Sequence, residues 1–220
     1  TLSTARDRPS SMVKRSRLQS HEAPRRRSWR VIVPSWPRAA DTADKLSRGI
    51  AEILDGEGIQ RTAIVGASFG GLVAQRFAFR YPDRVTRLIL ADTSIPRKAR
   101  AATNRRAARL IAVLPTGLVR WLLRGLGNKA MKGVDPTGFW TRYTAEVVAG
   151  LGADDLAARY RAAADFDAGP LLDGRSLAQR TLLLESDDDP IVQKAAAAAL
   201  REAFPAAAVH VFAGGGHAPS

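Results

Sequence analysis

The chain has 220 residues, of which 45% are hydrophobic, and a formal net charge of +13; this suits one α/β domain with an insertion. It contains no cysteine, which excludes disulfides and thiolate metal sites and fits the cytoplasmic location that we expect. No run of about 18 apolar residues occurs, so the sequence predicts no transmembrane helix.

The positive charge is concentrated in two segments. Residues 1–30 carry nine Lys or Arg against two acidic residues, and residues 97–132 carry ten Lys or Arg and no acid. Residues 1–28 are rich in Arg, Ser and Pro, which predicts a disordered basic tail. The second segment is interpreted as a solvated helix face, with an anionic substrate or membrane surface as the alternative partner. Neither segment contains a recognised nucleic-acid module, so we expect no nucleic-acid partner.

The first half of the chain alternates between strand and helix patterns. Residues 29–33 predict a short strand, and residues 41–54 predict a helix with an apolar stripe. Strand patterns follow at 61–65 and 85–91, separated by a helix pattern at 71–79.

A glycine-flanked serine lies between the second strand and its helix, in the run Gly66-Ala67-Ser68-Phe69-Gly70-Gly71. A G-x-S-x-G turn between a strand and a helix is typical of a nucleophile elbow. We expect Gly66 and Gly70 to be required because a Cβ at either position would crowd the turn. The helix that follows would direct its N-terminal N–H groups toward a negative charge formed at the serine.

The second half begins with helices and returns to the alternating pattern. The expected helices span 100–114, 116–126, 137–151 and 154–165, and they are followed by a strand at 181–185, a helix at 191–203 and a strand at 209–212. This order predicts an α/β fold with a mainly parallel sheet. The expected domains are a core of residues 29–96 and 166–220 and a helical cap of residues 97–165.

An aspartate cluster and a histidine follow the last two strands. Asp187, Asp188 and Asp189 come after the strand at 181–185, and His217 follows the final strand in a glycine-rich segment. The chain order Ser…Asp…His is the order of an acyl-transfer triad on this kind of fold. His217 would take the proton of Ser68, and one aspartate would orient the imidazole.

Other assignments of the acid remain open at this point. Asp92, at the end of the strand 85–91, is a weaker alternative acid. His21 and His210 lie in the basic tail and within a strand, which makes both poor candidates for a base. The aspartate cluster has no second ligand group nearby, so no metal and no other cofactor is expected.

The chain resembles the α/β-hydrolase superfamily over about residues 29–220. The segments that carry the resemblance are 66–71, 80–85, 186–192 and 214–219. The resemblance implies Ser68, Asp189 and His217 as catalytic residues, because Ser186 stands at the glycine position of the family's G-x-x-D acid motif; Asp188 is the second choice. It also implies the Phe69 N–H as an oxyanion-hole donor.

Two features differ from the family pattern. Residues 31–37 do not match the usual D-x-R-G-x-G-x-S loop and are similar to the maspardin-type subgroup. No His-Gly-type loop precedes Ser68, and the segment upstream is too polar to supply the family's first strands, so we expect an N-terminally incomplete fold.

The family resemblance and the departures from it lead to two candidate functions. The first is a serine hydrolase that cleaves an ester-type bond of a small acyl substrate. The alternative is a catalytically impaired or non-catalytic binding protein on the same scaffold. The sequence gives neither the substrate nor the oligomeric state.

Overall fold

The computed structural model describes residues 13–18, 29–130, 138–170 and 173–217. Two compact units divide the chain, Thr1–Pro37 and Arg38–Ser220. In the first unit, β1 (Val13–Leu18) pairs antiparallel with β2 (Trp29–Pro34), from Val13 opposite Pro34 to Leu18 opposite Trp29.

The hairpin corrects two expectations. Residues 13–18 form a strand, so the prediction of disorder for 1–28 is wrong for this stretch, while 1–12 and 19–28 lie outside the described residues. The strand was missed because Val13-Lys14-Arg15-Ser16-Arg17-Leu18 has no apolar alternation. The strand predicted at 29–33 exists, but it pairs with β1 and not with a strand of the parallel sheet.

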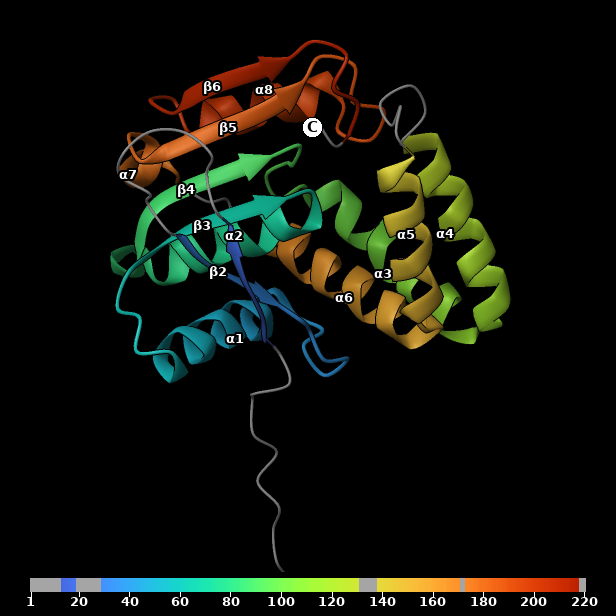
Figure 1. The fold of residues 1–220 in the computed structure, drawn as a ribbon. Coiled ribbons are helices and arrows are strands. Elements are labelled where there is room, and N and C mark those ends of the chain that lie inside the picture. Colours follow the sequence, from blue (N-terminus) through green and yellow to red (C-terminus); the bar gives the residue numbers. More distant parts are fainter. Residues whose placement is uncertain (1–12, 19–28, 131–137, 171–172, 218–220) are drawn as a thin grey trace, which may run out of the picture. The chain divides into compact units, whose positions relative to one another are not determined.

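The second unit contains a four-stranded parallel sheet in the order β3-β4-β5-β6. The α/β fold class predicted from the sequence is confirmed. In Figure 1 the four arrowheads point the same way, so the carboxyl ends of the strands share one edge. The elements of this core are β3 (Thr62–Ala67), β4 (Val85–Ala91), β5 (Thr181–Ser186), β6 (Ala208–Phe212), α1 (Ala43–Gly56), α2 (Phe69–Arg80), the 3-10 turn η2 (Pro82–Arg84), α7 (Arg175–Ala178) and α8 (Lys194–Ala203).

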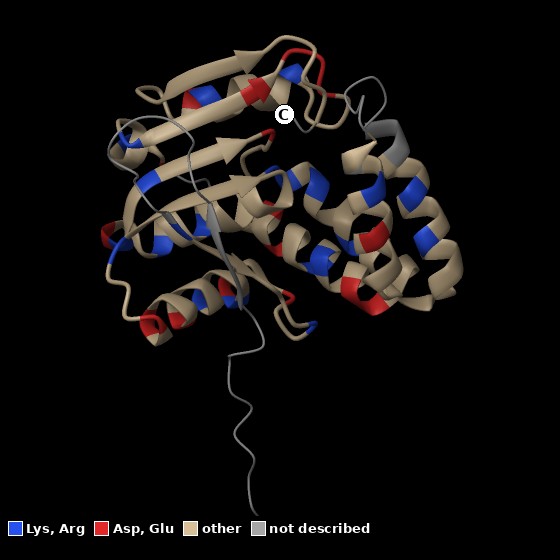
Figure 2. Ribbon diagram, in the orientation of Figure 1, with Lys and Arg blue, Asp and Glu red and all other residues tan. Residues whose placement is uncertain are grey.

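Four of the five described helices between β4 and β5, here called the cap helices, lie beyond the carboxyl ends of the strands (Figure 1). They are α3 (Lys98–Val113), α4 (Thr116–Ala130), α5 (Phe139–Gly150) and α6 (Ala153–Ala168). Each helix falls within a few residues of its predicted range. Figure 2 shows Lys and Arg, but no acidic residue, along α3 and α4.

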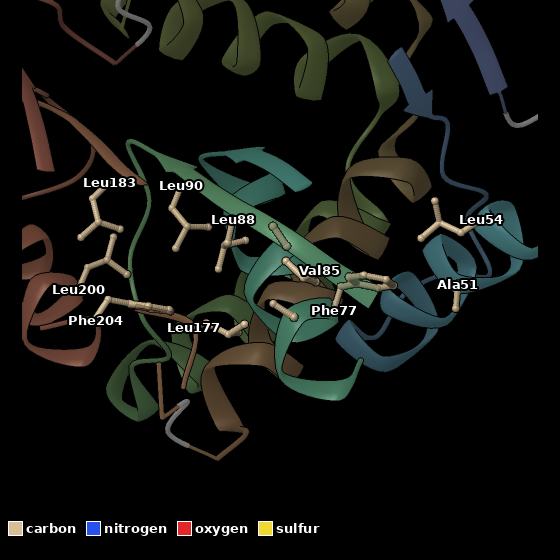
Figure 3. Close-up of a cluster of buried hydrophobic side chains, with 12 residues drawn as sticks. Ala51, Leu54, Phe77, Val85, Leu88, Leu90, Leu177, Leu183, Leu200 and Phe204 are labelled. Atoms are coloured by element: carbon tan, nitrogen blue, oxygen red, sulfur yellow. The ribbon is translucent and has the colours of Figure 1, made fainter. Parts of the chain in front are cut away.

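The main hydrophobic core lies between the parallel sheet and its helices (Figure 3). Leu88 and Leu90 of β4 and Leu183 of β5 are fully buried, and so is Phe77 of α2. A side chain of this size contributes about 1.5–3 kcal/mol when it is fully buried. Continuous apolar runs are typical of parallel strands covered on both faces, which is why β4 and β5 were predictable. This core holds the strand ends in place, and the candidate site is built on them.

Candidate active site

Ser68 occupies a strained turn between β3 and α2. Its backbone has φ 49° and ψ −119°, in a region that side-chain-bearing residues rarely adopt. The Ser68 N–H donates to the Ala91 carbonyl at 2.9 Å, and the Thr93 hydroxyl donates to the Ser68 carbonyl at 2.8 Å. Such a conformation costs about 1–3 kcal/mol and persists only when its surroundings enforce it. These bonds from β4 and the segment after it fix the serine at the end of the sheet.

Glycine is needed at two positions around Ser68. A Cβ on Gly66 would lie 2.7 Å from the Ala74 Cβ, and a Cβ on Gly71 would lie 2.6 Å from the Thr93 Cβ. The expectation for Gly66 is therefore confirmed. The same expectation for Gly70 is wrong, because a Cβ there meets no atom within 4 Å. The close approach of α2 to the strand ends thus depends on Gly66 and Gly71.

The structure brings Ser68, His217 and Asp189 together. His217 Nε2 lies 2.9 Å from Ser68 Oγ, and His217 Nδ1 lies 2.8 Å from Asp189 Oδ2. The Asp189 side chain is 3% exposed and that of His217 is 11% exposed. A buried carboxylate on Nδ1 favours the tautomer whose Nε2 is a free acceptor for the serine proton.

The three consecutive aspartates make different contacts. Asp189 Oδ1 accepts from the N–H groups of Ile191 and Val192 at 2.7 and 2.9 Å, which leaves Oδ2 for the imidazole. Asp187 and Asp188 instead hold the loop that carries His217. The Gly214 N–H donates to Asp187 at 2.9 Å, and the Gly216 N–H donates to Asp188 at 2.8 Å. The family resemblance singled out Asp189 as the acid, but no sequence signal indicated the backbone contacts of Asp187 and Asp188.

Asp92 lies near the same groups but has a different environment. It is buried at the end of β4 with φ 42°, and its Oδ1 accepts from the Ser186 N–H at 3.1 Å. Burial, together with the nearby Asp189 carboxylate, raises the pKa of Asp92 to about 6, although the His217 ring opposes the shift. A carboxyl group in this state is a poor partner for an imidazolium, because it loses its charge in mildly acidic solution.

The raised pKa makes Asp92 destabilising at neutral pH. The folded protein binds the Asp92 proton more tightly than the unfolded chain does, so this group lowers stability as the pH rises from about 4 to about 6. We expect Asp92→Asn to raise the free energy of unfolding by about 1–3 kcal/mol at pH ~8 and to leave it unchanged near pH ~4. Denaturant unfolding of both proteins at the two pH values measures the difference. An equal effect at both values would contradict the assigned pKa.

A cavity of about 400 Å³ opens beside Ser68. Ser68 and Phe69 line it from the core, and Asn104 and Tyr160 line it from the cap helices. Phe69 is the first residue of α2, so its N–H lies among the helix N–H groups that have no partner within the helix. The cavity is therefore of a size suited to a small molecule, with a serine hydroxyl and a helix N-terminus in its wall.

The wall formed by the cap helices also contains a buried polar group. The Asp167 carboxylate accepts from Asn104 Nδ2 at 2.8 Å and from the Arg97 N–H at 3.0 Å. Burial raises the pKa of Asp167. These bonds tie the end of α6 to α3, and sequence patterns gave no indication of them.

The residues that the structure describes contain neither a candidate metal site nor a candidate membrane span. No group of three or more His, Cys, Asp or Glu side chains is arranged there to hold a metal ion. No helix in the described part of the chain is both long and apolar enough to span a bilayer.

Residues 19–220 match the family model described as the alpha/beta hydrolase fold. The chain belongs to the alpha/beta hydrolase fold family. The match includes the β2 strand and all of the second unit, and it begins ten residues before the range expected from the sequence.

Curated proteins similar to this chain include a hydrolase and an acyltransferase. A 2-hydroxymuconate semialdehyde hydrolase of Pseudomonas putida is 33% identical over 180 residues, which cover 75% of this chain and 59% of that protein. A homoserine O-acetyltransferase of Thermus thermophilus is 41% identical over 49 residues, 22% of this chain and 13% of that protein. The chain thus spans less than two thirds of the length of these curated relatives.

The fold agrees with that of solved hydrolase structures. A thermophilic esterase from Thermogutta terrifontis superposes with a TM-score of 0.63 at 22% identity, covering 86% of this chain and 68% of that one. At this identity the likeness concerns the fold, and the chemistry of the site has to be argued from its own residues.

Proposed function

We propose that this alpha/beta hydrolase is a serine hydrolase that cleaves an ester-type acyl bond through an acyl-enzyme on Ser68. The observation that carries the proposal is the pair of hydrogen bonds from Ser68 Oγ to His217 Nε2 and from His217 Nδ1 to Asp189 Oδ2. Nucleophile and base within hydrogen-bond reach, with the base oriented by a third group, make up the arrangement that activates a serine.

The reaction would proceed in two halves. Ser68 Oγ attacks the acyl carbon while His217 Nε2 takes the hydroxyl proton, and the Asp189 carboxylate stabilises the imidazolium. The proton then passes to the oxygen of the leaving alcohol, the carbon–oxygen bond breaks, and the acyl group stays on Ser68. A water molecule attacks this ester with His217 again as the base, which releases the acid and restores the serine.

The helix N-terminus behind Ser68 would stabilise the oxyanion. The Phe69 N–H is the donor that we assign, because it follows the nucleophile at the first position of α2 and lines the cavity. Removing one oxyanion donor commonly costs about 10²–10³ in rate. This electrostatic contribution is a main reason to place the acyl carbonyl against the start of α2.

The expected substrate is a small acyl ester. The cavity of about 400 Å³ is within the range of small-molecule sites. The names of similar proteins, a hydrolase, an esterase and an O-acetyltransferase, favour acyl chemistry over other uses of a serine. No cofactor takes part in the proposed reaction, and the cytoplasmic location expected from the sequence stays a prediction.

Fluorophosphonate labelling tests the proposal. An activated Ser68 is expected to be labelled in the folded wild-type chain, and labelling is expected to be lost in Ser68→Ala with an unchanged circular dichroism spectrum. Ser94 is a matched control, because it also lines the cavity and Ser94→Ala keeps Ser68. Equal labelling of wild type and Ser68→Ala, or none in a folded wild-type chain, would reject the hydrolase and favour a binding protein on this scaffold.

A further inference from the structure

The outer face of α4 carries an exposed apolar stripe. Leu118, Trp121, Leu122 and Leu126 follow one another at helical spacing, and their exposed fractions are 42, 69, 45 and 58%. Residues at i, i+3, i+4 and i+8 share one face of an α-helix. The side of the helix that carries Val119, Leu123 and Gly127 is less exposed, and Val119 itself is only 3% exposed. The stripe is therefore directed away from the core.

Two further exposed apolar residues lie near the end of α3, shortly before α4 in the sequence. Leu110 and Val113 are 59 and 78% exposed, and they precede α4 by a short connection. We call these two residues and the α4 stripe the cap surface. Exposed apolar residues that share one face, as those of the α4 stripe do, mark interaction sites more often than scattered single ones do.

The segment that carries the cap surface has charge of one sign. Residues 97–132 contain ten Lys or Arg and no acidic residue, and Figure 2 shows this along α3 and α4. Arg124 of α4 and Arg105, Arg106 and Arg109 of α3 are exposed. The occupant of the cap surface must therefore combine an apolar layer with negative charge.

We propose that the cap surface docks onto an anionic lipid bilayer. A helix with Leu and Trp on one face and Arg beside them lies in the membrane interface with its apolar face among the acyl chains. Trp is enriched at that depth. Each basic residue near an anionic surface contributes about 1 kcal/mol, or about fivefold in partitioning. This interaction goes beyond the proposed hydrolase activity and does not depend on it.

Two other occupants fit these features less well. A nucleic acid would bind the arginines but would leave Leu118, Trp121 and Leu122 in water. A second copy of the chain on a two-fold axis would bring the arginines of one cap surface against those of the other, and like charges across an interface are unfavourable. An anionic bilayer accommodates both the apolar stripe and the charge.

Vesicle co-sedimentation of the full chain tests the proposal. The probe is vesicles of equal parts phosphatidylglycerol and phosphatidylcholine, compared with pure phosphatidylcholine. We expect the protein to pellet with the anionic vesicles at low salt and to be released in ~1 M salt, where screening acts within about 3 Å. Binding that is equal for both vesicles and insensitive to salt would overturn the proposal, as would no binding at all.

Matched variants separate the cap surface from the rest of the molecule. The double variant Trp121→Ser/Leu122→Ser is expected to lower partitioning at least about tenfold, whereas Phe79→Ser, which removes a 48% exposed aromatic side chain from α2, should not change it. Arg124→Glu should lower partitioning roughly ten- to thirtyfold, while Arg48→Glu makes the same charge change at an exposed site on α1. Circular dichroism checks folding of all four.

Three results from the vesicle, DNA and oligomer measurements would overturn the proposal. One is wild-type partitioning in the double variant. Another is binding of duplex DNA by a chain that does not bind vesicles. The third is a dimer in solution that the double variant converts to a monomer, since the cap surface would then be an interface between copies.

Discussion

His217→Ala is expected to lower kcat/KM for an activated ester by about 10⁴–10⁶. Without the imidazole, no group at 2.9 Å accepts the Ser68 proton, and no group returns it to the leaving alcohol. The labelling rate with a fluorophosphonate should fall with the turnover rate, because both reactions require the same activated oxygen. Steady-state kinetics with a p-nitrophenyl ester and timed labelling provide the two measurements.

His210→Ala is the matched control for this prediction. His210 lies in β6, is exposed and stacks edge-on against Phe212. Its imidazole is the same group as that of His217, but it lies outside the candidate site. We expect its replacement to leave turnover and labelling within about twofold, since it contacts no group of the site. Comparable losses in both variants would indicate a structural effect and would contradict the role of His217.

Asp189→Asn is expected to lower kcat by about 10⁴ while the fold is retained. The amide can still accept from Ile191 and Val192, but in place of a carboxylate it offers His217 Nδ1 a neutral group that can donate. The tautomer that presents a free Nε2 to Ser68 then loses its stabilisation, and no negative charge offsets the imidazolium.

The neighbouring aspartates give a matched comparison for Asp189. Asp188→Asn keeps an oxygen acceptor for the Gly216 N–H, and Asp187→Asn keeps one for the Gly214 N–H. Both should reduce kcat by no more than about tenfold, because they hold the backbone of the loop and do not contact the imidazole. Kinetics of the three variants at one pH would contradict the assignment if Asp188→Asn or Asp187→Asn were the most damaging.

The sequence predicted the parts of the site that depend on local patterns. The turn at Ser68 was predictable because a glycine-flanked serine stands directly between a strand pattern and a helix pattern. His217 and the aspartate cluster follow strands of one parallel sheet, whose carboxyl ends meet at one edge. Chain order and sheet topology together therefore indicated that Ser68, His217 and the aspartate cluster would meet. The family resemblance added Asp189 as the acid, and the hydrogen bonds join Ser68, His217 and Asp189.

The parts that the sequence missed depend on contacts between distant segments. Asp187 and Asp188 bind N–H groups 27 and 28 residues away, and no pattern within the cluster marks those partners. The need for glycine at Gly71 comes from Thr93, and the buried state of Asp167 comes from its contacts with α3. The β1 strand was missed for a different reason, because backbone pairing with β2 overrides its polar composition.

The most direct test of the central claim is to find the acyl group on Ser68. After rapid mixing of the wild-type chain with p-nitrophenyl acetate and an acid quench, mass spectrometry of the peptide containing Ser68 is expected to show one added acetyl group. The release of p-nitrophenol should show a burst close to one equivalent per chain. Ester hydrolysis that proceeds without acylation of Ser68, or a folded chain that neither turns over the ester nor becomes acylated, would contradict the account.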